Sequence, residues 1–179
     1  MIRVLGALSL AALCTASLFQ IVRPSVPRLL YNPSPSAPIG WYRLRPETYA
    51  HRGDLVAALA PKSGAALALE RDYLPPNIPL IKTVWAVSGE QICYVDRRVL
   101  VQGRPVLIVL KHDVLGRALP TRSGCYELSK DEVFLISNDV QTSFDSRYFG
   151  PVKRENLLGR VEYLGNFKGR SERRKAGHG

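Results

Sequence analysis

The sequence is poor in the residues that build metal sites and catalytic triads. It contains three cysteines and three histidines in 179 residues. His51, His112 and His178 lie at no zinc-ligand spacing with one another or with the cysteines, and none has the partners of a Ser/His/Asp triad. An internal repeat, a heptad pattern and a glycine-rich phosphate loop are also absent, which argues against solenoids, coiled coils and P-loop proteins. We therefore expect no metal ion and no cofactor.

The sequence has a single long hydrophobic run, which lies at the amino terminus. Residues Val4 to Val22 carry no formal charge and are mostly apolar. As a helix they would extend about 28 Å, close to the hydrocarbon thickness of a bilayer. The run predicts either a retained membrane anchor or a cleaved signal peptide with an exit point near Thr15-Ala16-Ser17. Arg3 precedes it and Arg23 follows it, so the charge rule alone does not settle the orientation.

Acidic residues are in the minority, because 15 Asp and Glu stand against 25 Lys and Arg and give a formal net charge of +10. The excess is concentrated in residues 168–179, where Glu172 is the one acidic residue. Such a tail suits nucleic acid or anionic lipid, but terminal segments are usually solvated, and we expect no nucleic-acid partner. The composition predicts a hydrophobic segment over 1–23, one domain over 24–165 and a basic tail over 166–179.

Two cysteines, Cys93 and Cys125, lie outside the hydrophobic run. An isolated pair in an exported chain predicts a disulfide. The bond would close a loop of about 33 residues, and the chain-entropy model gives such a loop roughly 4 kcal/mol of stabilisation. Two buried free thiols are the alternative.

Short strand-like runs dominate the rest of the chain. They are β-branched or apolar and are separated by Gly, Pro, Asp or Asn, which favours a mainly antiparallel β architecture. Ala65 to Tyr73 is the one clear helix candidate, and the five prolines between Arg23 and Pro38 predict an extended connector. The expected strands are Trp41–Leu44, Leu55–Leu59, Leu80–Val87, Ile92–Val95, Val99–Val101, Val106–Leu110, Val133–Ser137 and Leu158–Leu164.

Serine and lysine are the remaining candidates for catalysis. A serine hydroxyl needs a base to remove its proton, and a lysine can be that base when burial lowers its pKa far below the reference value of about 10.4. Lys82 follows the apolar run Ile78-Pro79-Leu80-Ile81 and is the lysine best placed for burial. Taken alone, it would more often be a strand-edge lysine with its ammonium in water.

Three segments together resemble the signal peptidase I superfamily of Ser/Lys proteases, and in particular its conjugal-transfer branch, the TraF-type pilin-maturation proteases. Ser36-Ala37-Pro38-Ile39-Gly40 matches the box of the nucleophilic serine, and Lys82 matches the general-base position. Ser143-Phe144-Asp145-Ser146-Arg147-Tyr148-Phe149-Gly150-Pro151 matches the third box. The resemblance runs from about Asn32 to Gly165 and implies a signal-peptidase-like, mainly β catalytic domain behind one hydrophobic helix.

The resemblance also implies a role for each matching residue. Ser36 would attack the scissile carbonyl, and Lys82 would take its proton and return it to the leaving amine. Ser143 would hold the lysine amine by a hydrogen bond. Asp145 would fix Ser143 and Arg147 within the third box, since a buried carboxylate needs such partners.

An oxyanion hole and a substrate cleft are expected beside the dyad. The backbone N–H of Ser36 and the hydroxyl of Ser34 would form the oxyanion hole. We expect a cleft beside Ile39 to Leu44, where an extended substrate could add to a sheet edge. The residues assigned to substrate binding are Ile39, Gly40, Trp41 and Tyr42.

The chain departs from the housekeeping signal peptidases at two places. Those enzymes commonly follow the lysine with Arg and later with Pro-Gly-Asp, whereas this chain has Thr83 and then Ser88-Gly89-Glu90. Their third box usually opens with Gly-Asp-Asn, and Ser137-Asn138-Asp139 stands here instead. Both differences point away from the housekeeping enzymes and are tolerable for the conjugal-transfer branch.

The leading hypothesis is a monomeric serine endopeptidase that processes a conjugative pilin precursor, with or without cyclisation of the product. It would work in the periplasm, at or anchored to the outer face of the inner membrane. A general signal peptidase acting on many exported precursors is the first alternative. A non-catalytic anchored component of a conjugative secretion apparatus is the second, and a self-cleaving repressor is disfavoured because nothing resembles a helix-turn-helix.

Overall fold

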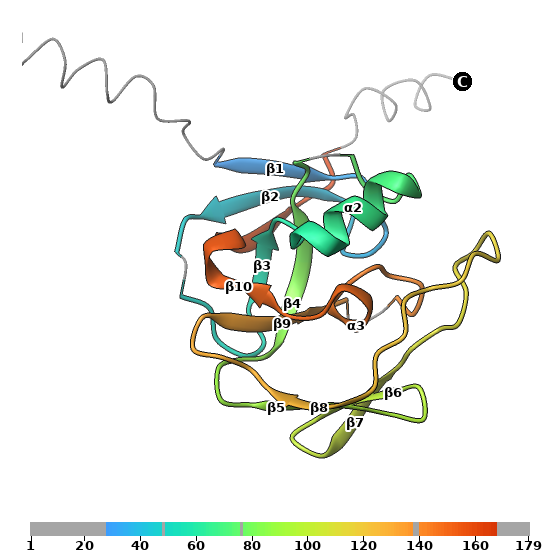
Figure 1. The fold of residues 1–179 in the computed structure, drawn as a ribbon. Helices are drawn as coiled ribbons and strands as arrows, with labels where there is room; N and C mark the ends of the chain where they lie inside the picture. Colours follow the sequence, from blue (N-terminus) through green and yellow to red (C-terminus); the bar gives the residue numbers. More distant parts are fainter. Residues whose placement is uncertain (1–27, 48, 76, 138–139, 168–179) are drawn as a thin grey trace, which may run out of the picture.

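Two antiparallel sheets make up the protein, and Figure 1 shows them with few helices. The computed structural model describes residues 28–47, 49–75, 77–137 and 140–167. The larger sheet contains β1 (Leu29–Asn32), β2 (Gly40–Arg45), β3 (Leu55–Ala58), β4 (Leu80–Ala86), β9 (Glu132–Ile136), β10 (Val152–Lys153) and β11 (Leu157–Gly165). The smaller sheet contains β5 (Gln91–Val95), β6 (Arg98–Val101), β7 (Arg104–Ile108) and β8 (Gly124–Glu127). The helical elements are α2 (Lys62–Glu70), α3 (Ser146–Phe149) and the 3₁₀ turn η1 (Arg154–Asn156).

Strand β4 lies inside the larger sheet, whose order is β1-β2-β11-β3-β4-β9-β10. It pairs antiparallel with β3 on one side and with β9 on the other. Side chains on both of its faces are largely buried, whereas β2 alternates buried and exposed residues because one of its faces meets solvent. Lys82, the charged residue of β4, is enclosed by protein and is 2% exposed.

The smaller sheet has the order β7-β6-β5-β8, and tight hairpins join β5 to β6 and β6 to β7. Both central residues of the turns Asp96-Arg97 and Gln102-Gly103 have positive φ, the backbone that two-residue hairpin turns require. Cys93 in β5 lies opposite Cys125 in β8, and a disulfide joins them. This bond therefore links two neighbouring strands of the smaller sheet.

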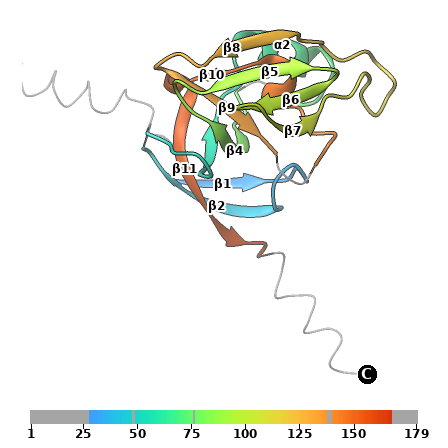
Figure 2. The same ribbon diagram turned by 90° about the horizontal axis from the view of Figure 1, so that it is seen from below.

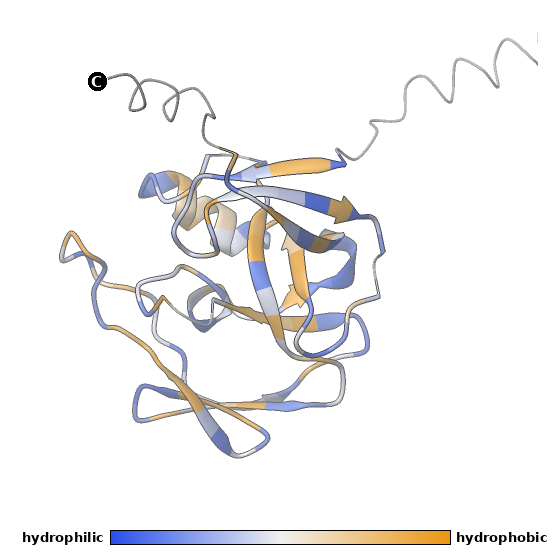
Figure 3. Ribbon diagram, turned by 180° about the vertical axis from the view of Figure 1, so that it is seen from behind, coloured by the Kyte–Doolittle hydropathy of each residue, from blue (hydrophilic) through white to orange (hydrophobic). Residues whose placement is uncertain are grey.

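Apolar side chains fill the space between the two sheets. Figures 1 and 2 place the smaller sheet at one end of the protein and β1 with β2 at the other. Figure 3 shows mostly hydrophobic strands in the middle of the larger sheet and hydrophilic turns in the smaller one. The core between the sheets includes the buried residues Ile92, Val99, Val101, Phe134 and Ile136. The two sheets thus share one hydrophobic core.

Helix α2 is held close to α3 by a glycine. A Cβ atom at Gly64 would lie 2.8 Å from the Cβ of Phe149, a distance that real side chains do not tolerate. The helix begins at Lys62, earlier than expected, after the extended Pro61. It ends before Tyr73 because Asp72 has a φ of 56°. This contact holds α2 against the segment that carries the third box.

The expected mainly β fold with a short helix is confirmed, and every predicted strand has a counterpart in the structure. Strands β1, β8 and β10 and the short helix α3 are additions. Within the described residues no helix is long and apolar enough to span a bilayer. The hydrophobic segment over 1–23 and most of the tail over 166–179 lie outside those residues, so the domain boundaries stay predictions.

Candidate active site

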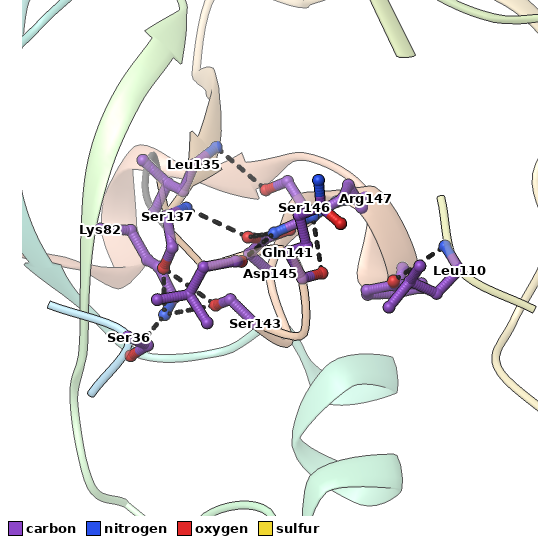
Figure 4. Close-up of polar contacts among 12 residues, drawn as sticks. Ser36, Lys82, Leu110, Leu135, Ser137, Gln141, Ser143, Asp145, Ser146 and Arg147 are labelled. Carbon is purple, nitrogen blue, oxygen red and sulfur yellow. Dashed lines mark hydrogen bonds and ion pairs between the residues drawn. The ribbon is translucent and has the colours of Figure 1, made fainter. Parts of the chain in front are cut away.

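The amine of Lys82 lies within hydrogen-bond distance of three serine hydroxyls. The side chain, from the middle of β4, is 2% exposed. Its Nζ atom is 3.0 Å from Ser36 Oγ, 2.8 Å from Ser137 Oγ and 3.0 Å from Ser143 Oγ. Figure 4 shows these four side chains converging from three different segments of the chain. The nucleophile box, the lysine and the third box, which are remote in sequence, therefore form one site.

Burial makes Lys82 a weaker base than an ordinary lysine. It lowers the pKa of the Lys82 amine from 10.5 to about 8, with Asp145 opposing the change and Arg147 adding to it. At a pKa of about 8, roughly a tenth of the amine is neutral at pH 7, against far less than one part in a thousand for an ordinary lysine. An amine with a pKa of about 8 has the strength that a general base needs near neutral pH.

The turn that carries Ser36 is tied together by the buried side chain of Asn32. The Nδ2 atom of Asn32 donates to the carbonyl oxygens of Ser34 and Ala37 at 2.8 and 3.0 Å. Its Oδ1 accepts from the backbone N–H of Ser34 at 3.1 Å. One side chain thus bonds to both sides of the proline-rich turn, which holds the Ser36 hydroxyl in front of the amine.

The two expected oxyanion donors contact each other in this structure. The backbone N–H of Ser36 donates to Ser34 Oγ at 3.3 Å, and Ser34 Oγ donates to Ser36 Oγ at 3.1 Å. Both groups therefore lie beside Ser36 Oγ. To stabilise an oxyanion, each would have to exchange its present partner for the substrate, and their oxyanion role stays a prediction.

Asp145 and Arg147 form a buried ion pair behind the hydroxyls. The guanidinium donates to both carboxylate oxygens, from Nε at 2.8 Å and from Nη2 at 2.7 Å, and both side chains are 0% exposed. Arg147 also donates to the carbonyl oxygens of Gln141 and Val140, which closes the loop before α3. The two charges compensate each other, so the pair adds little net charge beside the amine.

The comparisons with known proteins agree with this arrangement. Residues 1–164 match the family model described as "Signal peptidase, peptidase S26". The chain is 34% identical over 137 residues to a plasmid transfer protein TraF of Escherichia coli, covering 71% of this chain and 77% of that protein. It is 37% identical over 141 residues to a probable conjugal transfer protein TraF of Sinorhizobium fredii, covering 72% of each. The chain belongs to the signal peptidase family, peptidase S26.

Solved structures are also similar to the chain. One of them is a signal peptidase I from Enterococcus faecalis, with 18% identity and a TM-score of 0.40, and the match covers 64% of this chain and 97% of that one.

The contact between Lys82 and Ser137 was not predicted from the sequence of this S26 member. Asp145 was expected to fix Ser143, but its Oδ2 atom accepts instead from the backbone N–H of Ser137 at 3.1 Å. The antiparallel register places Thr83 opposite Ile136, so the next pair inward would be Lys82 and Ser137. That register was the one signal that could have found Ser137, and it follows only from knowing that β4 and β9 pair.

The expectation that a substrate adds to the edge of β2 is wrong. Strand β2 pairs with β1 on one side and with β11 on the other, so Gly40 to Leu44 has no free edge. Gly40 packs so closely that an added Cβ would lie 2.5 Å from the Gly165 carbonyl oxygen. The buried Tyr42 hydroxyl donates to the carbonyl oxygen of Pro38 at 2.6 Å and supports the turn.

Two of the expected substrate residues do meet solvent. Ile39 is 38% and Trp41 is 39% exposed. Trp41 packs against Tyr31 of β1 edge to face. Their part in substrate binding stays a prediction.

Within the described residues, one side of β4 next to Lys82 has no strand partner. In β4, Leu80 and Ile81 pair with β3, whereas the described part of β9 pairs only from Thr83 onward. The two residues before Lys82 therefore lack a described strand partner on their β9 side. This side of β4 is the better candidate for an extended peptide.

Proposed function

We propose that this chain is a serine endopeptidase with a Ser36/Lys82 dyad that processes an exported precursor, a conjugative pilin above all. The observation that carries the proposal is the 3.0 Å contact between Lys82 Nζ and Ser36 Oγ, made by an amine whose pKa burial lowers to about 8. Membership in the signal peptidase family supports the peptidase reaction.

Acylation begins with the Ser36 hydroxyl. As its Oγ attacks the scissile carbonyl carbon, its proton passes to the lone pair of neutral Lys82, and a tetrahedral oxyanion forms. The Lys82 ammonium then gives that proton to the leaving amine, the carbon–nitrogen bond breaks, and an ester remains on Ser36. One buried amine therefore serves in turn as base and as acid.

Deacylation repeats the same proton transfers. Water, or an amine for a cyclised product, attacks the ester while Lys82 accepts its proton, and the Ser36 oxygen leaves and regains a proton from Lys82. The N–H of Ser36 and the hydroxyl of Ser34 would donate to the oxyanion in both halves, and loss of one such donor typically costs 10² to 10³ in rate.

An extended precursor would lie along β4 beside Leu80 and Ile81. Backbone hydrogen bonds to this strand would fix the direction of the peptide and bring its scissile carbonyl to Ser36. This placement replaces the β2 edge that the sequence suggested.

The conjugal role rests on the relatives named TraF, which are called plasmid or conjugal transfer proteins. A periplasmic site at the membrane is supported by the hydrophobic run over 4–22 and by the Cys93–Cys125 disulfide, which suits an oxidising compartment. We propose that the chain acts there as a monomer.

The test is cleavage of the pilin precursor of the same conjugation system in membranes carrying the full-length chain. We expect wild type to cut and Ser36→Ala and Lys82→Ala to leave the precursor intact while accumulating to wild-type amounts. Normal cutting by either variant would refute the dyad. Intact conjugation with Ser36→Ala would favour a non-catalytic component of the apparatus.

A general signal peptidase is the second candidate, because the matching family model is that of signal peptidases. It predicts cleavage of many exported precursors after small residues. Mass spectrometry of exported proteins from cells that lack the chain separates the two, since accumulation of one uncut pilin alone supports the conjugal role.

A further inference from the structure

Lys82 has more hydroxyl partners than a two-residue dyad needs. Ser137 Oγ makes the shortest of its three contacts, at 2.8 Å. Ser137 and Ser143 are each 3% exposed, whereas Ser36 is half-buried. Only one of the three hydroxyls therefore lies where a substrate can reach it.

The hydrogen atoms of the amine indicate what the other two hydroxyls do. A protonated lysine has three N–H donors, and the three serines accept one each. The neutral base has two N–H donors and one lone pair. If Ser137 and Ser143 accept the two N–H groups, the lone pair is left facing Ser36, the geometry that proton abstraction needs.

We propose that Ser137 is a positioning residue, which together with Ser143 holds the two N–H groups of the Lys82 amine and so directs its lone pair at Ser36. The proposal rests on the function proposed above, in which Lys82 is the base.

Hydrogen bonds from neighbouring groups hold both the backbone and the hydroxyl of Ser137 in place. Its backbone N–H is held by Asp145, which the bidentate contact with Arg147 locks in turn. Its Oγ accepts from Ser143 Oγ at 2.9 Å, so the two hydroxyls orient each other. The charged groups that act on Lys82 are Asp145 and Arg147. Besides this direct electrostatic effect on the amine, the buried ion pair holds the backbone of Ser137 in place.

The test compares Ser137→Ala and Ser137→Thr in the full-length chain. Ser146→Ala is the matched control, because Ser146 is also buried and its hydroxyl accepts from the backbone N–H of Leu135 at 3.0 Å without touching Lys82. Two quantities are measured in detergent micelles: precursor cleavage between pH 6 and 10, and the titration of the Lys82 Cε carbon by NMR with Lys82→Ala to assign its signal.

We expect Ser137→Ala to lower the high-pH plateau of kcat by about tenfold to a hundredfold. A general base that is displaced from its position typically lowers the rate by such a factor. The Lys82 titration should move to lower pH, since the buried ammonium loses one acceptor. Ser137→Thr should restore the titration and most of the plateau. Ser146→Ala should leave the titration at its wild-type position, whatever it does to stability.

A Ser137→Ala chain whose plateau or whose Lys82 titration stays at the wild-type value overturns the inference, as does a shifted titration that Ser137→Thr fails to restore. A different observation would refute the proposed function itself, namely normal cleavage of the precursor by Ser36→Ala. In that case the lysine titration still decides whether Ser137 holds the amine.

Discussion

Lys82 Nζ and Ser36 Oγ lie 3.0 Å apart although 46 positions separate the two residues in the chain. Lys82 projects from the interior strand β4, and Ser36 from the turn between β1 and β2. The first residue is enclosed by the sheet, while the second is held by Asn32 at the surface. The buried amine of Lys82 thus contacts a half-buried serine hydroxyl, the arrangement on which the proposed dyad rests.

The pH dependence of cleavage should report the titration of Lys82. Only the neutral amine accepts the Ser36 proton, so kcat/KM should rise with pH through an apparent pKa of about 8 and level off above it. Precursor cleavage at constant ionic strength from pH 6 to 10 measures this profile. Lys82→Arg is the control, because a guanidinium stays charged and should give no activity at any pH in this range.

Lys82 should also lower the stability of the fold at neutral pH. Its pKa is lower in the folded chain than in the unfolded chain, so the unfolded state binds the extra proton between about pH 8 and 10.5. The free energy of unfolding should therefore rise with pH across this window. Lys82→Met should stabilise the fold at pH 7 by on the order of 1 to 2 kcal/mol, measured by urea unfolding, and this gain should shrink towards pH 10. A Lys82→Met chain less stable than wild type at pH 7 would contradict the cost assigned to the buried amine.

Replacement of Arg147 should strongly lower the free energy of unfolding. Arg147→Met leaves Asp145 as a buried carboxylate without its partner, and such a change typically costs about 3 to 5 kcal/mol. Arg160→Met removes the largely exposed pairs of Arg160 with Glu47 and Asp54 and should cost less than about 1 kcal/mol. Equal effects of the two variants in urea unfolding would show that the Asp145–Arg147 pair does not hold the third box together.

The disulfide should stabilise the smaller sheet without affecting catalysis. The Cys93–Cys125 bond joins β5 and β8 of the smaller sheet, whereas Lys82 lies in β4 of the larger sheet. Replacing both cysteines by serine in a Cys14→Ser background should lower the free energy of unfolding by up to roughly 4 kcal/mol. At 20 °C kcat should stay within about twofold of the parent, and a larger loss would tie the bond to the active site.

Much of the site could be predicted because its residues lie in short local motifs. Each motif can be recognised from its local sequence alone. The motifs are the segment Ser36-Ala37-Pro38-Ile39-Gly40, Lys82 in its apolar run, and the third box. The strands were predictable for a similar reason, since they are apolar runs between turn residues. Strand β1 was hidden by the prolines around it, and α3 is too short to show a helical period.

The features that were missed depend on long-range pairing. The contact of Ser137 with Lys82 follows from the register of β9 against β4, some fifty residues apart in the chain. The free edge expected at β2 is occupied by β11, from the far end of the domain. No local pattern reports which strands pair, so neither feature was visible in the sequence.

The most direct test of the central claim is to trap the covalent intermediate. The full-length chain is mixed with the pilin precursor, quenched in acid within seconds, digested and analysed by tandem mass spectrometry. We predict a precursor-derived peptide joined as an ester to Ser36, and no such adduct with Lys82→Ala. An adduct on another residue, or cleavage at the wild-type rate by Ser36→Ala, would contradict the Ser36/Lys82 mechanism.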